Sequence, residues 1–455
     1  MATYVNDLRL KEIATGDESG TWGTSTNTNL ELIAEAFGSG SEALSDASTA
    51  TITMADGASD AARAMALTLT GSLSQACTVT LAPNTVNKCW IIQNSAGDTV
   101  TISQGTGSNV VIPNGSIKMI VTDGAGSGAA VTDVLAMTSG AGNVGLGNAA
   151  LGTGITTGTD NVAIGDSAGD ALTTGSDNTF VGDTAGGATT TGDRNTAVGS
   201  AALLANTTAV RNTAVGHTAG TAITTGDNNV AVGYNAMATN TVGDRNIAVG
   251  AGALSTYNPS SNEDSHNIAI GFDALKATTT GKQNTAIGGL SLDANTTADA
   301  NTAVGYQALG ANTTGHSNVA VGKDALQANT TANHNIAIGV DALQANTTGA
   351  TSVAIGGQAL TANTTGGNNV AVGYQALDAN TTASSNTGIG YQALSANTTG
   401  ANSVAVGYQA LDANTTANAN TGIGYQALSA NTTGANNVAV GYQALDANTT
   451  ANANT

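Results

Sequence analysis

The sequence predicts an all-β fold in three parts: a short N-terminal segment with one helix, a small antiparallel β-domain, and a long parallel β-roll or β-solenoid shaft. Three observations support this prediction. A 17-residue repeat governs the chain from Asn143 onward. Large side chains are scarce, with 3 Phe and 2 Trp among 455 residues, so an ordinary globular core of this length is not expected. The 59 glycines, together with frequent Asn, Thr and β-branched residues, argue against long helices.

Charge and termini narrow the function classes. The chain has 11 Lys and Arg against 31 Asp and Glu, which argues against a nucleic-acid partner. The N-terminus has no cationic stretch followed by an apolar one, and no run of about 18 apolar residues occurs, so we expect neither classical secretion nor membrane insertion. Cys77 and Cys89 lie in apolar runs, which predicts two buried thiols, with a single disulfide as the alternative.

Residues 1–38 form the first predicted part. A turn-rich loop from Asp17 to Asn29 precedes Leu30, Ile33 and Phe37, which follow one another at helical spacing. The pattern predicts one short amphipathic helix after the loop.

Residues 39–138 form the second predicted part, a small antiparallel β-domain with Trp90 in its core. Strand-like runs separated by turn clusters containing Pro, Asn and Gly indicate it. The runs are residues 66–70, 77–81, 89–92, 99–102 and 117–121.

Residues 139–455 form the predicted shaft. Its repeat reads Asn-Val-Ala-Val-Gly-Tyr-Gln-Ala-Leu-Asp-Ala-Asn-Thr-Thr-x-x-x, and it has 18 full copies. A nineteenth copy begins at Asn454, from which we expect that the natural protein continues. Position 1 of the copies falls at residues 143, 161, 178, 195, 212, 229, 246, 267, 284, 301, 318, 335, 352, 369, 386, 403, 420 and 437.

Each copy is expected to form one rung of a stacked parallel coil. Position 5 is Gly in every copy, and the residues before it form a short strand. In that strand we expect the β-branched residues, such as Val162 and Ile164, to face inward. The Asn-Thr-Thr segments read as corners. Stacked at about 4.8 Å, 18 rungs would span about 86 Å. Because so thin a coil buries little apolar surface, we expect three chains to share a core.

Asn fills position 1 in 16 of 18 copies, which predicts a ladder of stacked amides; a ligand-binding row is the alternative. Eleven Ala-Asn-Thr-Thr segments match the N-glycosylation pattern, but the corner already explains their phase. The four His residues fall at different repeat positions, so we expect no metal site, cofactor or catalytic residues.

A stripe of Tyr residues follows the repeat Gly in the later rungs and is a candidate glycan or receptor contact, with mutual stacking as the structural alternative. Tyr234 shares this position. Tyr257 lies in a four-residue insertion, which is either a recognition loop or an inert bulge. The candidate contacts are Tyr257, Tyr306, Tyr374, Tyr391, Tyr408, Tyr425 and Tyr442.

The repeat core Asn-Val-Ala-Val-Gly resembles the head repeat of trimeric autotransporter adhesins, whose chains form a trimeric left-handed parallel β-roll. The segment from Gly20 to Gly38 is similar to the N-terminus of bacteriophage tail fibre proteins, and the block Asn301 to Leu309 is common in phage fibres. The resemblance implies an attachment role for Trp22, Leu30, Ile33 and Phe37. The 17-residue period is longer than that of the adhesin heads.

We therefore expect a non-enzymatic phage tail fibre, made in the host cytoplasm and carried on the virion. Its N-terminus would bind phage tail or portal-proximal proteins, and its distal end a host surface glycan or receptor. A bacterial surface adhesin or extracellular filament subunit is the alternative, and an ice-binding solenoid, suggested by the Thr-Thr pairs, is a third hypothesis.

Overall fold

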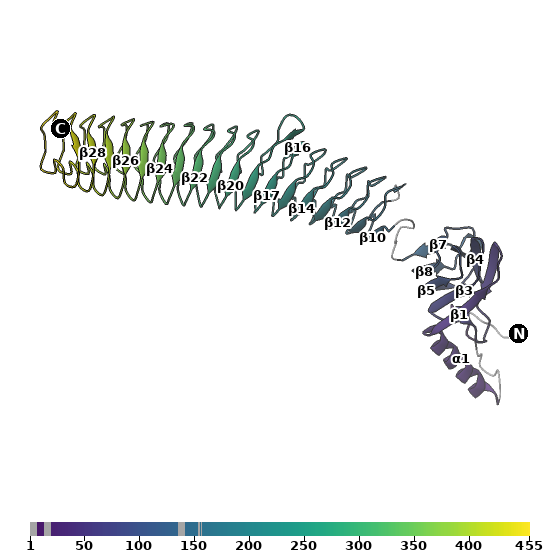
Figure 1. The fold of residues 1–455 in the computed structure, drawn as a ribbon. Helices are drawn as coiled ribbons and strands as arrows, with labels where there is room; N and C mark the ends of the chain where they lie inside the picture. Colours follow the sequence, from purple (N-terminus) through teal and green to yellow (C-terminus); the bar gives the residue numbers. More distant parts are fainter. Residues whose placement is uncertain (1–6, 13–19, 135–141, 153–154, 156) are drawn as a thin grey trace. The chain divides into compact units, whose positions relative to one another are not determined.

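The computed structural model describes residues 7–12, 20–134, 142–152, 155 and 157–455 (Figure 1). The chain divides into two compact units, Met1–Leu146 and Gly147–Thr455. Apart from the helix α1 and two short 3-10 turns, η1 (Ala61–Arg63) and η2 (Gly126–Gly128), every regular element in the described ranges is a strand. The predicted all-β class with one N-terminal helix is therefore confirmed.

Helix α1 spans Trp22–Ala36 and begins earlier than the sequence suggested. The Thr- and Asn-rich stretch expected to form a loop is the first half of the helix. Thr and Asn are mediocre helix formers, so contacts with the rest of the unit must hold this half. The helix buries Leu32 and Ala36.

The first unit has two sheets. The five-stranded sheet has the order β1-β3-β5-β8-β9, and the four-stranded sheet has the order β2-β4-β6-β7. The strands are β1 (Ser39–Leu44), β2 (Thr49–Thr53), β3 (Ala66–Gly71), β4 (Cys77–Ala82), β5 (Asn87–Ser95), β6 (Val100–Ser103), β7 (Val110–Ile112), β8 (Ile117–Asp123) and β9 (Val131–Asp133).

The prediction of an antiparallel domain is wrong, because the sheets are mixed. The pairs β1–β3, β3–β5, β2–β4 and β4–β6 are parallel. Only β5–β8, β6–β7 and β8–β9 are antiparallel. Consecutive strands from β1 to β6 alternate between the two sheets, so each strand returns beside the one two places earlier and runs in the same direction.

Trp90 lies in the core of the first unit, as predicted. Its side chain is buried, and its Nε1–H donates to the Ala62 carbonyl oxygen at 3.0 Å. Cys77 is buried and Cys89 half-buried, and both are free thiols. The disulfide alternative is thus not realised.

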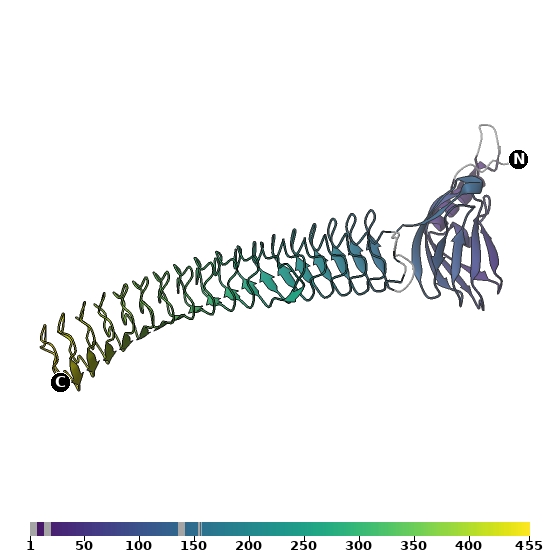
Figure 2. The ribbon, with the colours of Figure 1, turned by 90° about the horizontal axis from the view of Figure 1, so that it is seen from above.

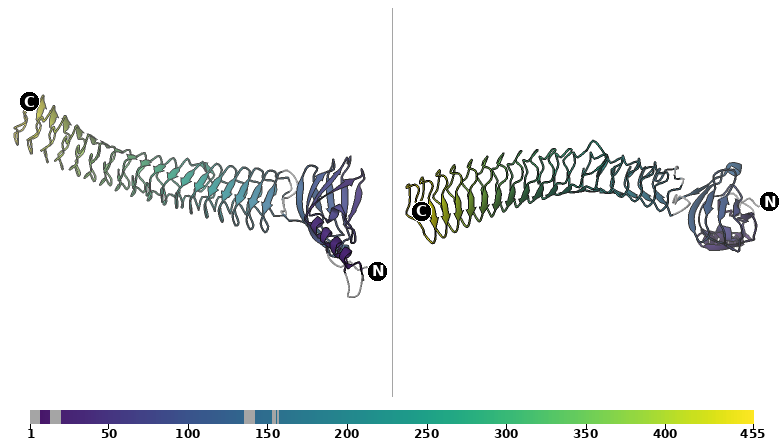
Figure 3. Two further views of the ribbon diagram at one scale, coloured as in Figure 1. Left: turned by 90° about the horizontal axis from the view of Figure 1, so that it is seen from below. Right: turned by 45° about the horizontal axis from the view of Figure 1, so that its top comes forward.

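The repeat region forms one parallel sheet of 18 strands with one strand per copy, and its rungs follow one another in chain order (Figures 2 and 3). The strands are β10 (Val144–Leu146), β11 (Val162–Ile164), β12 (Thr179–Val181), β13 (Thr196–Val198), β14 (Thr213–Val215), β15 (Val230–Val232), β17 (Ile247–Val249), β19 (Ile268–Ile270), β20 (Thr285–Ile287), β21 (Thr302–Val304), β22 (Val319–Val321), β23 (Ile336–Ile338), β24 (Val353–Ile355), β25 (Val370–Val372), β26 (Thr387–Ile389), β27 (Val404–Val406), β28 (Thr421–Ile423) and β29 (Val438–Val440). The insertion adds a separate pair, β16 (Gly243–Asp244) and β18 (Glu263–Asp264).

The expectation that the β-branched residues face inward is wrong. In each three-residue strand of the solenoid the middle residue is buried and its two neighbours are not. In β11, Ala163 is inside, and Val162 and Ile164 face outward. The core consists mainly of Ala at positions 3 and 8 and Leu at position 9. Because a rung is thin, its facing walls leave room for a methyl group at position 3.

One rung shows how tightly this core is filled. Phe180 replaces Ala at position 3 of its rung and is fully buried. Position 9 is Gly in the same rung and in the rung before it, at Gly186 and Gly169. A Cβ on Gly186 would lie 2.5 Å from Phe180 Cε1, and one on Gly169 would lie 2.7 Å from Cδ2. The ring thus occupies the volume that Leu side chains fill elsewhere, as close packing requires.

The corners depend on residues with positive φ. Position 5 has φ near 135°, and a Cβ on Gly390 would lie 2.3 Å from the carbonyl oxygen of Gly407 in the next rung. Only Gly fits there. Leu at position 9 also has positive φ, for example 57° at Leu394, which L-residues adopt at a cost that burial of the side chain must offset.

Candidate functional site

Helix α1 carries an apolar face that the described residues of its unit leave exposed. Trp22, Leu30 and Phe37 are 66%, 59% and 75% exposed, and Ile33 is half-buried. At 100° per residue the four positions fall within an arc of about 80° on one side of the helix axis. The residues assigned to attachment by resemblance are therefore neighbours on one surface, which we call the α1 apolar face.

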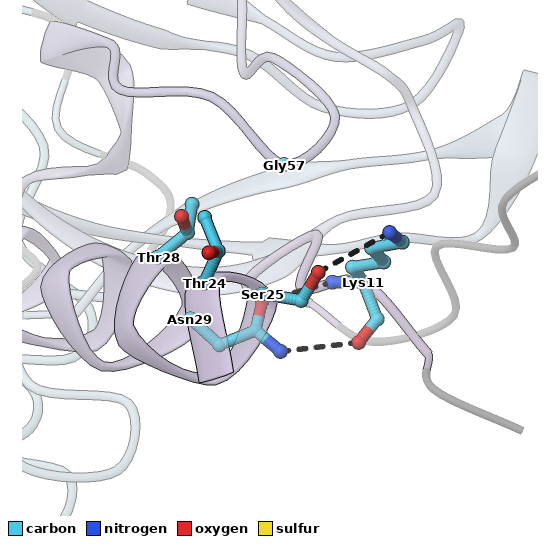
Figure 4. A pocket seen from close by; sticks show the side chains of 6 residues that line it. All are labelled: Lys11, Thr24, Ser25, Thr28, Asn29 and Gly57. Atoms are coloured by element: carbon cyan, nitrogen blue, oxygen red, sulfur yellow. Dashed lines mark hydrogen bonds between the residues drawn. The ribbon is translucent and has the colours of Figure 1, made fainter. Parts of the chain in front are cut away.

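The edge of α1 beside the apolar face is held by polar contacts with the segment that contains Lys11. Asn29 Oδ1 accepts a hydrogen bond from the Lys11 backbone N–H, and Asn29 Nδ2 donates to the Lys11 carbonyl oxygen, both at 3.1 Å (Figure 4). Lys11 Nζ lies 3.3 Å from Ser25 Oγ. A small hollow beside these residues is also lined by Thr24, Thr28 and Gly57 and contains no pair of titratable groups. These contacts explain why the Thr- and Asn-rich half is helical.

A buried guanidinium supports the same region. Arg63 is fully buried, and its Nη2 donates to the carbonyl oxygens of Ala55 at 2.7 Å and Ala58 at 2.9 Å. Arg63 also forms ion pairs with Asp60 at 3.3 Å and with Glu35 of α1 at 3.8 Å. The helix is thus fixed relative to the loop before η1, so that its apolar face is presented on a rigid support.

The second candidate surface is the outer strand face, defined as positions 2 and 4 of the solenoid strands. Position 4 is Leu, Ile or Val in all 18 copies, and position 2 is Val, Ile or Thr, with no charged residue at either. Many of these side chains are more than a third exposed, for example Ile164 at 40%, Ile287 at 39% and Ile389 at 38%. Soluble monomers rarely expose a continuous apolar surface of this extent.

The tyrosine stripe is a stacked ladder. Tyr391 lies 5.2 Å from Tyr408 with ring planes 8° apart, and 5.8 Å from Tyr374 with planes 20° apart. Tyr425 and Tyr442 continue it at 5.2 Å. Each inner ring therefore has both faces covered by its neighbours. The structural alternative of mutual stacking is confirmed for these five residues. In the three inner rings only the edges and hydroxyl groups face solvent, whereas each end ring keeps one face without a neighbouring ring.

Gln residues at position 7 form a ladder beside the rings. Nε2 of Gln392 donates to Oε1 of Gln375 at 2.9 Å, and Gln409 donates to Gln392 at 3.0 Å. These amide contacts fix the spacing of the rungs on the surface.

The remaining predicted Tyr contacts differ in accessibility. Tyr306 is 49% exposed and has no ring beside it in the adjacent rungs, where Gly289 and Lys323 occupy position 6. Tyr234 stacks on His217 at 5.8 Å. Tyr257 is 0% exposed, so its selection as a contact is wrong. It fills position 12 of its rung, a position that is also buried where Asn fills it, as at Asn295. Glu263 of the insertion pairs with Lys282 at 2.6 Å.

Two amide ladders lie inside the solenoid. At position 1 the side-chain oxygen of each Asn accepts from the backbone N–H of the next rung, as from Asn178 to Asn161 at 3.0 Å, and Nδ2 of Asn178 donates to the Gly192 carbonyl oxygen at 2.8 Å. This confirms the predicted structural ladder. In the two copies that have Ser at position 1, the hydroxyl oxygen is the acceptor. Ser352 accepts from the backbone N–H of Asn369, and Ser403 accepts from that of Asn420.

The second ladder, at position 12, is one that sequence reasoning missed. Asn346 donates to Asn329 at 3.0 Å, and Asn363 to Asn346 at 2.9 Å. Ten of the eleven Asn residues in the Asn-Thr-Thr motifs are fully buried and so are not accessible to glycosylation in the folded chain, whereas Asn448 in the last copy is half-buried. The signal in the sequence is the recurrence of Ala-Asn-Thr-Thr at the same phase in eleven copies, which the corner alone also explains.

The described residues hold no group of three or more His, Cys, Asp or Glu side chains placed to bind a metal ion. His316 and His334 meet edge to face at 5.2 Å, beside a shallow hollow that includes Asp299 and Thr314. Within the described ranges, helix α1 is too short and too polar to cross a bilayer, and no other helix qualifies.

No protein-family model matches the chain, and comparisons with curated proteins and with solved structures give no significant match. The α1 apolar face, the outer strand face and the column of residues at position 6 are the three candidate functional surfaces of the described residues.

Proposed function

We propose that this chain is a structural virion protein, a phage tail fibre whose repeat region is a rigid shaft. The observation that carries the proposal is the unbroken solenoid: 18 strands in one parallel sheet, with two buried amide ladders along it. An array in which each rung contacts only its neighbours is stiff along its axis and extends by adding copies. Such an element spans distance, and nothing in the proposal involves catalysis or a cofactor.

The proposed assembly is a homotrimer held through the outer strand face. The core is complete within each chain, so a shared core is not needed. The reason for association is instead the uncharged surface at positions 2 and 4, aliphatic apart from the Thr residues at position 2, whose burial would remove apolar area from water along the whole shaft. The net charge of −20 opposes association through other faces.

The proposed attachment surface is the α1 apolar face, with Trp22 and Phe37 as its largest side chains. Aromatic residues on a rigid support are typical anchors of protein interfaces. Its proposed partner is a phage tail or portal-proximal protein, and the far end of the shaft would face a host glycan or receptor. The protein would then be made in the host cytoplasm and end on the virion.

The first experiment tests attachment. Particles carrying Trp22→Ala/Phe37→Ala should lose fibre density in cryo-electron micrographs, whereas Glu31→Gln, at an exposed position on the same helix away from the apolar face, should keep it. Equal occupancy in both preparations contradicts the attachment role. Filaments found on bacterial surfaces without particles would favour the adhesin or filament alternative.

The second experiment tests the trimer. Val406→Glu changes an outward residue of the outer strand face, and Thr399→Glu changes an exposed residue on the opposite corner. Sedimentation equilibrium of the full chain should give a trimer for the parent and for Thr399→Glu, and a lower mass for Val406→Glu at unchanged circular dichroism. A monomeric parent would refute the trimer.

A further inference from the structure

The residues at position 6 form a column along the solenoid, and their type differs between the middle and the later rungs. Tyr fills five consecutive rungs from Tyr374 to Tyr442, but in the middle of the shaft aromatic and small residues alternate. There the order is Tyr234, Ala251, Phe272, Gly289 and Tyr306. We call these five residues the gapped column, because every second rung lacks a ring.

Backbone hydrogen bonds place the five residues in successive rungs. The N–H groups of the residues at position 7 donate to the position 6 carbonyl oxygens of the preceding rung: Gly252 to Tyr234 at 2.9 Å, Asp273 to Ala251 at 3.0 Å, Leu290 to Phe272 at 2.9 Å and Gln307 to Gly289 at 3.1 Å. The four-residue insertion after Asn246 does not disturb this order, since β17 pairs with β19 in register. One rung without an aromatic side chain, that of Ala251, therefore lies between Tyr234 and Phe272. A second, that of Gly289, lies between Phe272 and Tyr306.

The size of each gap follows from the ladder elsewhere in the column. Successive rings there lie 5.2 to 5.8 Å apart. Rungs in a parallel sheet repeat at about 4.8 Å, so Phe272 and Tyr306 are about 10 Å apart along the axis. The atoms nearest to a Cβ on Gly289 would be Tyr306 Cδ2 at 3.6 Å, Cε2 at 3.9 Å and the Phe272 carbonyl oxygen at 4.0 Å, which are ordinary van der Waals distances. The gap has the thickness of one inserted ring.

The rings beside the gaps are open to solvent. Tyr234 and Phe272 are 59% and 61% exposed, compared with 42% for Tyr408 within the ladder. An exposed Phe beside a Gly on a rigid scaffold is apolar surface that the fold itself does not use. Sequence reasoning passed over Phe272 because it singled out Tyr alone.

Polar groups follow each ring in the chain. The residues after the three aromatic residues are Asn235, Asp273 and Gln307, which carry amide or carboxylate groups. Their oxygens already have partners: Asn235 accepts from Thr218, Asp273 pairs with Lys276 at 2.9 Å and Gln307 accepts from Gln327 at 3.0 Å. Apolar ring faces next in the chain to polar side chains suit a flat molecule that has C–H groups on its faces and hydroxyl groups at its edge. The chain's net charge of −20 disfavours an anionic ligand.

We propose that the gapped column is a saccharide-binding site, in which two pyranose rings of a neutral oligosaccharide enter the levels of Ala251 and Gly289. Phe272 stacks on both sugars, and Tyr234 and Tyr306 close the outer faces. Position 6 is not one of the two positions that define the outer strand face, so substitutions in the gapped column leave the residues of the proposed trimer surface unchanged. The inference deepens the proposed adhesive role and rests on it for its biological meaning.

The proposal is tested by saturation-transfer NMR and calorimetry on the full chain, with cellohexaose, maltohexaose and chitohexaose as neutral probes. At least one probe should bind the parent. Phe272→Ala removes the ring shared by both gaps and should weaken binding at least tenfold. Gly289→Tyr fills one gap with a residue that other copies carry at this position, and should also weaken binding.

A second kind of variant should gain binding instead of losing it. Tyr408→Gly opens a gap between Tyr391 and Tyr425 in the ladder, and should add a second binding site for the same probe. Binding that is unchanged in Phe272→Ala, the absence of binding by all three probes, or equal binding of indole would each overturn the proposal. Trimer mass and fibre attachment are measured separately, so failure here leaves the proposed function standing, and the reverse also holds.

Discussion

Nδ2 of Asn397 donates a hydrogen bond to Oδ1 of Asn380, the residue at the same position of the preceding rung, at 3.0 Å. The same nitrogen donates to the Gly400 carbonyl oxygen at 2.9 Å. Both side chains are fully buried. One amide thus joins neighbouring rungs and also closes the corner of its own rung.

Asn397→Ala should destabilise the solenoid by about 1–3 kcal/mol, because it leaves buried amide groups of the adjacent rungs without a partner. Thr382→Ala, at an exposed corner position, is the control and should change stability by less than about 0.5 kcal/mol. Denaturant unfolding followed by circular dichroism measures both. Equal effects of the two substitutions would show that the ladder is not a major source of stability.

Gly390→Ala should destabilise strongly. Position 390 has φ 132°, and the new Cβ would lie 2.3 Å from the Gly407 carbonyl oxygen, so strain of about 1–3 kcal/mol is added to a backbone clash. Gly357→Ala is a matched control, because its Cβ meets only Tyr374 ring atoms at 3.4 and 3.7 Å. Thermal unfolding should separate the two variants clearly. A tolerated Gly390→Ala would mean that the position 5 backbone differs from the one described.

Acidic pH should stabilise the folded solenoid because of the buried carboxyl group of Asp412. Burial raises the pKa of this carboxyl group, against the opposing effect of the Ala413 backbone N–H. The folded chain then holds the proton more tightly than the unfolded chain, so the stabilisation is present at low pH and is lost as pH rises through the raised pKa. Asp412→Asn should therefore be more stable than the parent at pH 7, and the difference should shrink at pH 3.

Calorimetric scans at the two pH values test this expectation. Asp183→Asn, at an exposed position 6 side chain, should change stability at pH 7 by less than about 0.5 kcal/mol. If the difference in stability between Asp412→Asn and the parent grew on acidification, the expected effect of the raised pKa would be contradicted.

Lys88 should make the first unit more stable in alkali. Its Nζ donates to the carbonyl oxygens of Ala62, Arg63 and Ala64, and lies 5.0 Å from the Trp90 ring centre. Burial lowers the pKa of Lys88 from 10.5 to about 8. Between these values the unfolded chain binds more protons than the folded chain, so stability rises with pH.

Both Trp residues lie in the first unit, so Trp fluorescence reports its unfolding. Urea midpoints should rise between pH 8 and 10.5 in the parent. The rise should be smaller in Lys88→Met and should persist in Lys118→Met, which removes the ion pair with Asp133. A flat profile in the parent would contradict the role of Lys88.

The sequence determined the repeat, its period and its register, because a 17-residue spacing with Gly at position 5 admits one strand and one tight corner per copy. It also determined the position 1 amide ladder, since identical residues in parallel rungs must stack. The placement of Trp90 followed from its apolar strand.

Only the tertiary structure decided which side of each strand is inside. Alternation along a strand defines two faces, but it does not say which of Ala163 and Val162 is buried; the thin rung decides, because its facing walls leave room for a methyl group. The directions of β1 to β6 likewise depend on the path of the chain between two sheets, and Tyr257 is buried because position 12 of its rung faces the interior. Turn residues mark where a chain bends, whereas the contacts that set its direction come from segments distant in sequence.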